Sequence, residues 1–540
     1  MWILSNGPQY AKGWYHWLVS NGRSTPKSRL APPPCTLSEI PTMAMLNIRD
    51  FGALSSPPQP ESLNVSQVNR QAIEAAFAKA GPGGTVLVPS DGSFYTLGGA
   101  AIANTSNVTF RLEGALVAAP EYDDWPIDGG ASNQATYSPF LEFSNAEGLT
   151  VAGAAGTRLD LAEATGRGLI DGRGKGWWNR EILPSIFGKL RGKRPKLLHI
   201  EDSERIVVQN LTMLNSPSFH LLLEDVAQVE VGWVNITVDR KMQRALRARA
   251  TGGATSDGAL GSGLGALEPE DLNTDGIDPS GRDVWVHHTH IENDDDSIAV
   301  KPCSSARCKH SACSQDMIFE DSTFTGMGAS IGSVPPHNPP NCVRNITFRR
   351  IDMPKTGVPR RPPPAPPTAR SPPRPPPPPR SRALAGKGVY IKSNPSCERD
   401  PGGPPVSATI SDIVYEDMSI DQPRWWAIWI GPQQQHEPNT ALGEKCALDY
   451  PITPHCPTQG CVTFANITLR NIRVTSPLLS PGVLLGNASN PMQNILFDNV
   501  TVDHPGSFPY KKDYQCENVV GRATGGSSPQ GCLTPGKPKQ

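Results

Sequence analysis

The chain has 540 residues and a formal net charge of −1, with 50 basic and 51 acidic side chains. This balance excludes a strongly basic nucleic-acid-binding protein, and we expect no nucleic-acid partner. The sequence contains no run of 18 apolar residues, so we expect no membrane partner either. Hydrophobic residues make up 37% of the chain, which suffices for a core, while 51 glycines and 56 prolines predict many turns.

The first 44 residues show no periodicity, and we expect residues 1–44 to form a loose leader. They contain no apolar core of about 7–15 residues, so they show no clear signal peptide. Eleven cysteines and several Asn-x-Ser/Thr sequons nevertheless favour the secretory pathway, although Asn-Ile-Thr also suits the edge of a strand. The expected location is therefore extracellular or in a cell wall, with disulfide bonds and glycans.

The next segments predict a strand and a capping helix. Met45–Ala53 alternates apolar and polar residues, as a strand does. Gln67–Ala80 places Ile73, Ala76 and Phe77 at helical spacing before a GPGG stretch ends the pattern. A short helix of this kind could cover the first open edge of a stack of strands.

A six-residue pattern then recurs along the chain. It consists of an apolar residue, any residue, a polar residue that is usually Asn or Asp, and then apolar, any and apolar residues. The copies are VQNLTM (208–213), VHHTHI (286–291), FEDSTF (319–324), FRRIDM (348–353), YEDMSI (415–420), LRNIRV (469–474) and FDNVTV (497–502). From residue 288 onward, successive third positions lie 33, 29, 67, 54 and 28 residues apart. The shorter steps fit single coils, and the longer ones fit two coils or a coil with an insertion.

Each copy could bury its apolar face only by stacking on its neighbours, which predicts an all-β parallel β-helix over residues 45–503. The alternatives, a β-sandwich or a propeller, would need Asn-Gly or Asp-Gly hairpin turns about every 8–12 residues, and these are scarce. Two segments interrupt the repeat: a Gly-rich flexible loop at 249–270 and a proline-rich insertion at 359–382. Residues 504–540 are expected to form a C-terminal tail.

Carboxylates crowd the stretch that follows the flexible loop. Asp275 and Asp295 are 20 residues apart, with Asp278, Asp294 and Asp296 close by. A coil that returns after about 20–25 residues would place Asp275 and Asp295 on neighbouring strands, about 5 Å apart. Inverting hydrolysis of a glycosidic bond uses two carboxyl groups about 6.5–9.5 Å apart, one protonated and one ionised. Crowding raises one pKa and so supplies the acid. The alternatives are a solvated acidic turn and a Ca²⁺ site, whose ligands usually stand at alternate residues.

Several stretches, in their order along the chain, resemble glycoside hydrolase family 28, the polygalacturonases and their relatives. They are LNIRDFGA (46–53), GLIDGRGKGWWN (168–179), RPKLLHIEDSERIVVQNLTMLNSPSFHL (194–221), NTDGID (273–278), DDSIAVK (295–301), GMGASIGS (326–333) and GVYIKS (388–393). The resemblance implies a single right-handed parallel β-helix of the pectin-lyase type. It also implies a monomer that hydrolyses a pectin-like polysaccharide by the inverting mechanism, with no cofactor and no metal.

The resemblance assigns roles residue by residue. Asp295 would be the general acid, while Asp275 and Asp296 would hold and activate the attacking water. Lys392 would meet the carboxylate of a uronic acid unit, since an ammonium group pairs with a carboxylate. Asn273 would orient the site from the substrate-binding side.

Two expected substrate-binding positions depart from the family pattern: Met327 replaces a His, and Tyr390 replaces an Arg. Met cannot exchange a proton usefully, and Tyr cannot form a bidentate salt bridge, although it can stack on a sugar. His220 or His337 could replace the missing His. The departures keep open a weakened or inactive wall-binding protein, or a hydrolase of a different glycan. A lyase is disfavoured, because it would need Ca²⁺ or a basic residue in place of the paired acids. Asp294 has no role in the resemblance.

Cysteine clusters predict disulfides rather than zinc. Cys303, Cys308 and Cys313 share a short segment with His310, but their spacing matches no common zinc module. A second cluster consists of Cys446, Cys456 and Cys461. Because eleven is odd, at least one thiol stays unpaired or pairs with another chain.

The RWWAIWI segment invites a sugar-stacking interpretation. On a strand, Trp425 and Trp429 would share one face, and Trp426 would take the other. We expect one of these faces to belong to the core.

Overall fold

The computed structural model describes residues 45–55, 63–128, 135–154, 168–250, 272–303, 308–354, 386–393, 397, 403–435, 446–447, 450–527, 529 and 531–535. The chain divides into two units, and all of these residues belong to the second, Ala44–Gln540. The predicted leader and the proline-rich insertion lie outside the described residues. So does the predicted flexible loop, apart from the two residues that end a helix at Ala250.

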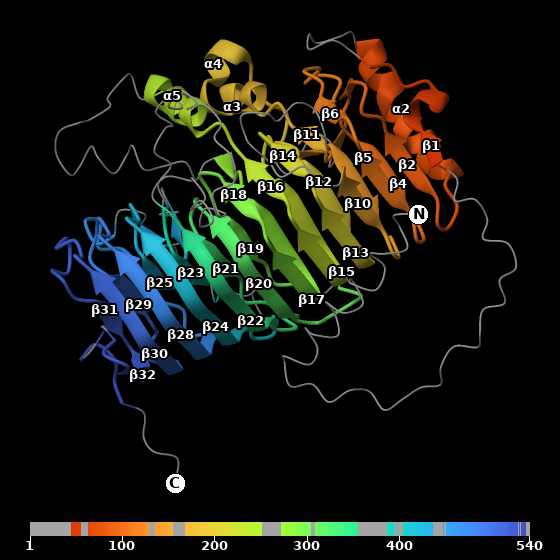
Figure 1. Cartoon of the computed structure of the whole chain (residues 1–540). Helices are drawn as coiled ribbons and strands as arrows, with labels where there is room; N and C mark the ends of the chain where they lie inside the picture. The colour runs from red at the N-terminus through yellow and green to blue at the C-terminus, as the bar shows by residue number, and fades with distance from the viewer. Residues whose placement is uncertain are drawn as a thin grey trace, which may run out of the picture. The chain divides into compact units, whose positions relative to one another are not determined.

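Parallel strands stack coil upon coil in the order of the chain (Figure 1). Ladder A, which carries the candidate site, consists of β4 (Ala100–Ala103), β9 (Leu141–Ser144), β12 (Leu198–Glu201), the start of β15 (Leu221–Gly232), the start of β17 (Ile277–His287), β19 (Ile298–Val300), β21 (Ala329–Val334), β23 (Val389–Ser393), β25 (Ile428–Pro432), β29 (Gly482–Leu485) and β31 (Gln515–Glu517).

Two further ladders complete each coil. Ladder B consists of β1 (Met45–Asn47), β2 (Thr85–Val88), β5 (Thr109–Leu112), β10 (Thr150–Gly153), β13 (Glu204–Gln209), the later parts of β15 and β17, β20 (Ser314–Phe324), β22 (Asn341–Met353), β24 (Ala408–Asp421), β28 (Val462–Thr475), β30 (Met492–Asp503) and β32 (Val519–Thr524). Ladder C consists of β3 (Ser93–Thr96), β6 (Ala115–Ala118), β11 (Leu169–Asp171), β14 (Thr212–Leu214), β16 (Asn235–Thr237), β18 (His290–Glu292) and the ends of β20, β22, β24, β28 and β30.

Smaller elements surround the coils. The helices are η1 (Ile48–Phe51), α2 (Leu63–Lys79), α3 (Lys175–Ile182), α4 (Pro184–Phe187) and α5 (Arg240–Ala250). Two short sheets pair β7 (Ile127–Asp128) with β8 (Thr136–Tyr137) and β26 (Gln434–Gln435) with β27 (Cys446–Ala447). None of the described helices is long and apolar enough to cross a bilayer.

The predicted repeat marks one corner of the coil. Its third residue adopts a left-handed backbone conformation in all seven copies, which Asn and Asp tolerate better than most residues. The residues are Asn210, His288, Asp321, Arg350, Asp417, Asn471 and Asn499, with φ between 50° and 55°. Side chains also join successive corners, because Asn471 donates to Asp417 (3.0 Å) and accepts from Asn499 (2.9 Å). The polar third residue of the sequence pattern therefore marks the corner of each coil. The predicted parallel β-helix is confirmed.

The apolar positions of the repeat form a continuous core. Phe319, Phe348 and Tyr415 stack along it, with ring centroids 4.6 and 4.8 Å apart. All three side chains are fully buried. Such stacks arise because parallel coils place equivalent residues in register.

Helix α2 covers the first coil, as the sequence predicts, although it begins four residues earlier than expected. Its Phe77 ring meets Phe110 and Phe143 at 5.2 and 5.4 Å. Buried Asn69 donates to the carbonyls of Leu54 (3.0 Å) and Tyr95 (2.7 Å), which ties the helix to the coil. The helix thus protects the apolar core at the open end of the stack.

The coils continue beyond the predicted end of the domain at residue 503. Strand β31 pairs with β29, and β32 pairs with β30. The segment predicted as a tail therefore contains one more coil. Its strands are short or contain glycine, which is why they lack the repeat pattern.

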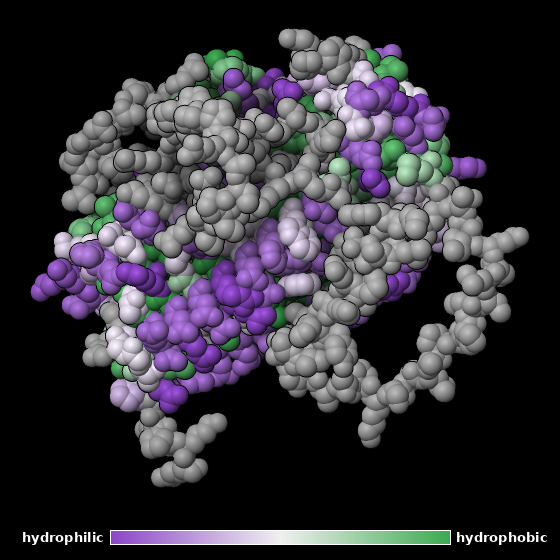
Figure 2. Space-filling view, in the orientation of Figure 1, coloured by the Kyte–Doolittle hydropathy of each residue, from purple (hydrophilic) through white to green (hydrophobic). Residues whose placement is uncertain are grey.

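The outward face of ladder B is hydrophilic (Figure 2). Opposite charges alternate across its strands, since Glu320, Arg349, Glu416, Arg470 and Asp498 are paired in register. Arg349 donates to Glu320 at 2.6 Å. Alternating charges stabilise neighbouring parallel strands and keep this face in water.

Ten cysteines form five disulfides, which confirms the predicted disulfide bonding. The pairs are Cys303–Cys308, Cys313–Cys342, Cys397–Cys461, Cys446–Cys456 and Cys516–Cys532. The eleventh, Cys35, lies outside the described residues.

We predict that Phe348→Ala costs about 3–5 kcal/mol of folding stability, because it opens a cavity inside the aromatic stack. Urea denaturation followed by circular dichroism measures the loss. Thr347→Ala is the matched control, since Thr347 is half-buried at the preceding, outward-facing position of the same strand. Equal losses for the two variants would contradict the packed stack.

Candidate active site

The turns that precede the strands of ladder A stack into one continuous row. This turn row consists of residues 216–220, 273–276, 293–297, 325–328, 386–388 and 425–427. Main-chain hydrogen bonds connect successive turns: Gly276 donates to the Asp296 carbonyl (2.9 Å), and Met327 donates to the Asp295 carbonyl (2.7 Å). The position of every side chain in the row therefore depends on the register of the coils.

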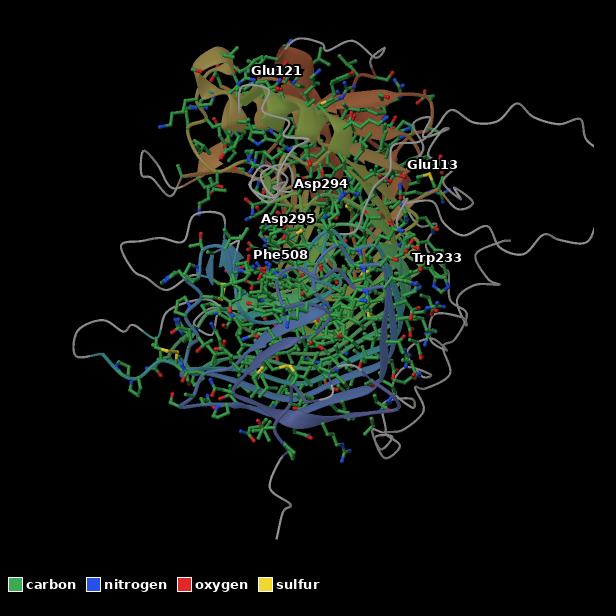
Figure 3. All side chains as sticks on the ribbon, turned by 90° about the vertical axis from the view of Figure 1, so that its left-hand side faces the viewer. Glu113, Glu121, Trp233, Asp294, Asp295 and Phe508 are labelled. Atoms are coloured by element: carbon green, nitrogen blue, oxygen red, sulfur yellow. A yellow bond between two sulfur atoms is a disulfide. The ribbon has the colours of Figure 1, made fainter. Side chains whose placement is uncertain are left out.

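Asp275, Asp295 and Asp296 meet in this row, and we call them the carboxylate triad. One oxygen of each lies within 4.8 Å of an oxygen of the other two. Their exposed fractions are only 3%, 7% and 1%, respectively. Figure 3 shows Asp295 beside Asp294.

The triad oxygens are closer than the separation of about 6.5–9.5 Å that we expected for an inverting pair. Asp275 and Asp296 stand in directly adjacent turns, which the Gly276–Asp296 hydrogen bond holds together. Neighbouring parallel strands are about 4.8 Å apart, so short carboxylate distances follow from the coil itself.

Burial and crowding favour a proton within the triad. Burial raises the pKa of Asp275 well above its ordinary value, and the Asp295 and Asp278 carboxylates raise it further. Burial also raises the pKa of Asp278 to about 6, against the opposing effect of Lys301. The Lys301 ammonium lies 3.4 Å from an Asp278 oxygen. A proton on Asp275 would therefore relieve both the cost of burying its charge and its repulsion with Asp295.

Asp296 has a different environment, because two donors hold its carboxylate. Lys392 donates to one oxygen and Ser330 to the other, both at 2.6 Å. Burial alone would lower the pKa of Lys392, but the carboxylates of Asp296, Asp295 and Asp275 hold it above its ordinary value. The ammonium group therefore stays charged and holds an Asp296 oxygen by a charge-assisted hydrogen bond.

Asp294 belongs to the acidic run but not to the triad. Arg240, the first residue of α5, donates from its Nε to an Asp294 oxygen. Both side chains are buried. This ion pair connects Asp294 to a helix outside the coil, whereas Asp295 and Asp296 both join the triad.

Asn293 links the two acidic segments. It is fully buried, and its side-chain amide donates to the carbonyls of Thr274 (2.9 Å) and Asp296 (2.8 Å). Gly276 allows the same close approach, since a Cβ there would stand 2.3 Å from the Ser297 carbonyl. These two residues fix how closely the halves of the triad approach each other.

The two departures from the family pattern occupy the same surroundings as the triad. Met327 is buried, and its sulfur lies against Gly386 of the next turn. Tyr390 is buried on β23, and its hydroxyl accepts a hydrogen bond from the Gln434 N–H at 3.2 Å. The ammonium groups of Lys387 and Lys392 lie 3.6 and 4.6 Å from the Tyr390 ring centroid. The loss of the Arg therefore does not remove positive charge from this place.

Neither candidate histidine replaces the missing one. His220 Nε2 accepts from the Ser216 N–H at 3.2 Å, so Nδ1 carries the proton and donates to the Asp275 carbonyl at 2.9 Å. Burial lowers the pKa of His220 to about 4, which keeps the ring neutral. His337 pairs through its backbone with Ser407, away from the turn row. His220 positions the Asp275 backbone and does not supply a proton.

Asn273 lies at the rim of the site. It is exposed, adopts a left-handed backbone with φ 42°, and its carbonyl accepts from Ser218 at 3.4 Å. Its amide thus faces solvent beside the triad, where it could reach a substrate.

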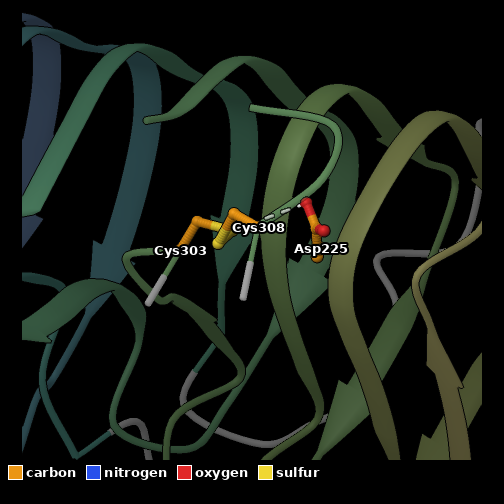
Figure 4. Close-up of side chains that lie close together, drawn as sticks. All are labelled: Asp225, Cys303 and Cys308. Atoms are coloured by element: carbon orange, nitrogen blue, oxygen red, sulfur yellow. Dashed lines mark hydrogen bonds between the residues drawn. A yellow bond between two sulfur atoms is a disulfide. The ribbon is translucent and has the colours of Figure 1, made fainter. Parts of the chain in front are cut away.

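The cysteine segment forms a covalent loop beside the outward face of ladder A. The Cys303–Cys308 disulfide lies against Asp225 (Figure 4). Asp225 accepts from the backbone N–H groups of Lys309 and His310, the latter at 3.1 Å. Because both sulfurs are bonded to each other, they cannot bind a metal as thiolates.

The three tryptophans form one cluster, and the predicted split between two faces is wrong. Trp425 and Trp426 precede β25, so the strand alternation does not apply to them. Both are buried with Trp429, and the Trp426 and Trp429 rings are 6.0 Å apart. Tyr390 packs in the same cluster. The cluster stiffens the outer wall beside the triad.

Sequence reasoning missed several residues that surround the triad. Ser330 and Lys301 stand inside the recognised stretches, and Asn293 and Lys387 flank them, so proximity to a motif could have identified them. Arg240 carries no such signal, because it lies 54 residues before its partner on a separate helix.

A sequence profile of glycosyl hydrolases family 28 matches residues 84–359, about half of the chain. A probable endo-xylogalacturonan hydrolase A from Aspergillus fumigatus is 28% identical over 284 residues, covering 52% of this chain and 55% of the relative. A probable rhamnogalacturonase E from Aspergillus flavus is 24% identical over 269 residues, covering 50% and 44%, respectively. The matches thus span about half the length of these curated relatives.

Solved structures share the fold. An endo-xylogalacturonan hydrolase from Aspergillus tubingensis aligns with a TM-score of 0.55 and 19% identity, covering 89% of this chain and 98% of that one. An exopolygalacturonase from Thermotoga maritima aligns with a TM-score of 0.57 and 16% identity, covering 91% and 93%. The coil, the order of the motifs and the profile match agree, and the chain belongs to glycosyl hydrolases family 28.

Proposed function

We propose that the chain hydrolyses glycosidic bonds of a pectin-like polyuronide by inverting acid–base catalysis. The observation that carries this proposal is the meeting of three buried carboxyl groups within 4.8 Å, one of them held by a lysine and a serine. Such a set offers a proton and an ionised base at the same place. Membership of the hydrolase family supports this reaction.

Asp295 is the proposed general acid. Its Oδ1 accepts the Asp296 N–H at 2.8 Å, which fixes the orientation of the carboxyl group. We propose that it shares with Asp275 the proton that burial and crowding favour there. Transfer of this proton to the glycosidic oxygen lets the leaving sugar depart as an alcohol.

Asp275 and Asp296 are proposed to hold the attacking water. A water molecule that donates to two carboxylates at about 2.8 Å, with a tetrahedral angle, holds their oxygens about 4.6 Å apart. The oxygens of Asp275 and Asp296 lie within 4.8 Å of each other, so one water molecule fits between them. Asp296 takes a proton as the water oxygen bonds to the anomeric carbon, which inverts the configuration.

Positive charge around the triad supports an acidic glycan as substrate. Lys392 and Lys387 approach the Tyr390 ring, and Lys301 lies beside Asp278. A uronate carboxylate could pair with Lys392 while its sugar ring meets Tyr390, and the fully buried Lys387 would add positive charge behind them. Asn273, Met327 and Tyr390 are proposed to complete the substrate-binding wall.

We also infer that the protein works outside the cell, as a monomer. Five disulfides in the described part of the chain are typical of an oxidising compartment. The single domain from residue 45 through the last coil would carry the whole site.

We predict that Asp295→Asn lowers the rate of sugar release by about 10³-fold or more, because the leaving oxygen then receives no proton. Reducing-end assays on polygalacturonate, xylogalacturonan, rhamnogalacturonan and neutral glycans measure the rate and identify the substrate. Nuclear magnetic resonance of the first product should show an inverted anomer.

Asp294→Asn is the matched control, and it should keep measurable activity. A retained anomer would contradict the proposed water attack, because a short carboxylate separation also suits a covalent intermediate. Glycan binding without release by the unaltered protein would replace the enzyme proposal with a wall-binding role.

The pH dependence should follow the raised pKa of Asp275. Activity falls as pH rises and the Asp275–Asp295 pair loses its proton. Asp278 is ionised above its pKa of about 6, and its charge raises the pKa of Asp275. Asp278→Asn should therefore move the alkaline limb of kcat/KM to lower pH, by about one unit.

The control for this measurement is Asp417→Asn, an exposed corner residue of β24. Its profile should match that of the unaltered protein. An alkaline limb that stays in place in Asp278→Asn, or moves to higher pH, would refute the proposed coupling.

Asp294 is proposed to have a structural role through Arg240. We predict that Arg240→Met destabilises the fold by about 3–5 kcal/mol, since it removes a cation from a buried carboxylate. Adding Asp294→Asn should restore part of the loss in urea denaturation. Arg205→Met, which breaks the exposed pair with Glu147, should cost less than about 1 kcal/mol. Similar losses for Arg240→Met and Arg205→Met would contradict this role.

A further inference from the structure

Four side chains form a second polar cluster on the outward face of ladder A, separate from the triad. His199 and Glu201 stand two residues apart on β12, so they share one face. Glu142 is in register with His199 on β9, and Glu224 is in register with Glu201 on β15. Three successive coils thus place three glutamates around one histidine.

The histidine is buried and points into this cluster. Its exposed fraction is 6%, whereas half of the Glu224 side chain faces solvent. His199 Nε2 lies 3.4 Å from a Glu224 oxygen and 3.9 Å from a Glu201 oxygen, and Nδ1 lies 3.7 Å from Glu142. No hydrogen bond of good geometry joins either ring nitrogen to the described residues, and the three glutamates stand only at ion-pair distance from the ring. A buried imidazole without such a bond is costly, unless another group satisfies it.

The spacing suits a metal ion better than direct hydrogen bonds. Donor atoms bound tetrahedrally to Zn²⁺ at about 2.0–2.1 Å lie about 3.3 Å from one another. One donor atom each of His199, Glu201 and Glu224 lies within 4.8 Å of the others. A small movement of the Glu224 and Glu201 side chains would bring all three donor atoms within bonding distance of one ion.

We propose that His199 Nε2, Glu201 and Glu224 bind a divalent transition-metal ion of the Zn²⁺ class. Glu142 faces the other ring nitrogen. A carboxylate in that position fixes the tautomer and the ring orientation of a metal-bound histidine. The solvent-facing side next to Glu224 leaves a coordination position open for water or another oxygen ligand. One nitrogen and two carboxylates favour Zn²⁺ over Ca²⁺, which prefers oxygen ligands alone.

The ion would lie near the triad on the same face. His199, Leu222 and Asp278 occupy successive positions of one register row. Two strand spacings separate His199 from Asp278, which is about 10 Å. If the proposed polyuronide hydrolysis holds, the ion would neutralise an otherwise acidic floor beneath the substrate and offer its open position to a uronate.

The test measures metal binding and needs no catalytic activity, so it stands or fails apart from the proposed function. The full chain, stripped with a chelator and kept free of thiol reductants, is titrated calorimetrically with Zn²⁺, and separately with Ca²⁺. We expect about one Zn²⁺ per chain. Glu224→Gln and His199→Gln should each weaken binding by about tenfold or more, and Glu142→Gln should weaken it less strongly.

Two controls locate the site. Glu204→Gln removes a carboxylate from β13 on ladder B, and Asp295→Asn removes a carboxylate from the triad. Both variants should bind Zn²⁺ like the unaltered protein. Co²⁺ provides a second readout, because its visible absorption changes on imidazole ligation and should be lost in His199→Gln.

Three results would overturn the proposal. The first is that the unaltered chain binds no Zn²⁺. The second is that the Glu224→Gln and His199→Gln variants bind Zn²⁺ as tightly as the unaltered chain. The third is that Ca²⁺ binds at least as tightly as Zn²⁺. In the first case, a proton on His199 would occupy the cluster in place of a metal. Because Glu224 is half exposed, its variant should fold normally, which a circular dichroism spectrum checks.

Discussion

The candidate site depends on the register between two neighbouring turns. The Gly276 N–H donates to the Asp296 carbonyl, and this bond sets the Asp275 side chain against its partners. A side chain at position 276 would meet the Ser297 carbonyl at 2.3 Å, so only glycine permits the approach. Asn293 fastens the same two turns from within. The register of the coils therefore sets the distance between the carboxylates. The apolar core, which is far larger than the site, holds the coils in this register.

Crowded carboxylates would destabilise the fold if nothing balanced them. The protein places one buried or half-buried cation beside each of three acids: Lys392 at Asp296, Lys301 at Asp278 and Arg240 at Asp294. At Asp275, burial raises the pKa well above its ordinary value, and the neighbouring Asp295 and Asp278 carboxylates raise it further. The three cations thus offset the cost of burying the carboxylates beside them, whereas burial and neighbouring carboxylates favour a proton on Asp275.

Much of this arrangement follows from the sequence, because a parallel coil converts sequence spacing into spatial contact. The 20-residue interval between Asp275 and Asp295 predicted their meeting, and the third positions of the repeat marked the left-handed corners, as at Asn471. Contacts that cross between the coil and its insertions could not be predicted. Arg240 reaches Asp294 from a helix outside the repeat, and no periodicity connects them. The prediction that Trp426 faces away from the other tryptophans was wrong for a local reason. Strand alternation does not apply to Trp426, because it precedes β25.

The altered residues at 327 and 390 show how such a site can change its contacts and keep its geometry. Met327 still donates its N–H to the Asp295 carbonyl, so the turn keeps its path without the family histidine. Tyr390 buries its ring in the tryptophan cluster and lies beneath two ammonium groups. The Lys387 ammonium of the preceding turn thus places positive charge beside the ring at position 390. A lysine presents one compact charge where an arginine would present a planar fork, so under the proposed function recognition would depend on the position of the charge and the shape of the wall more than on bidentate pairing.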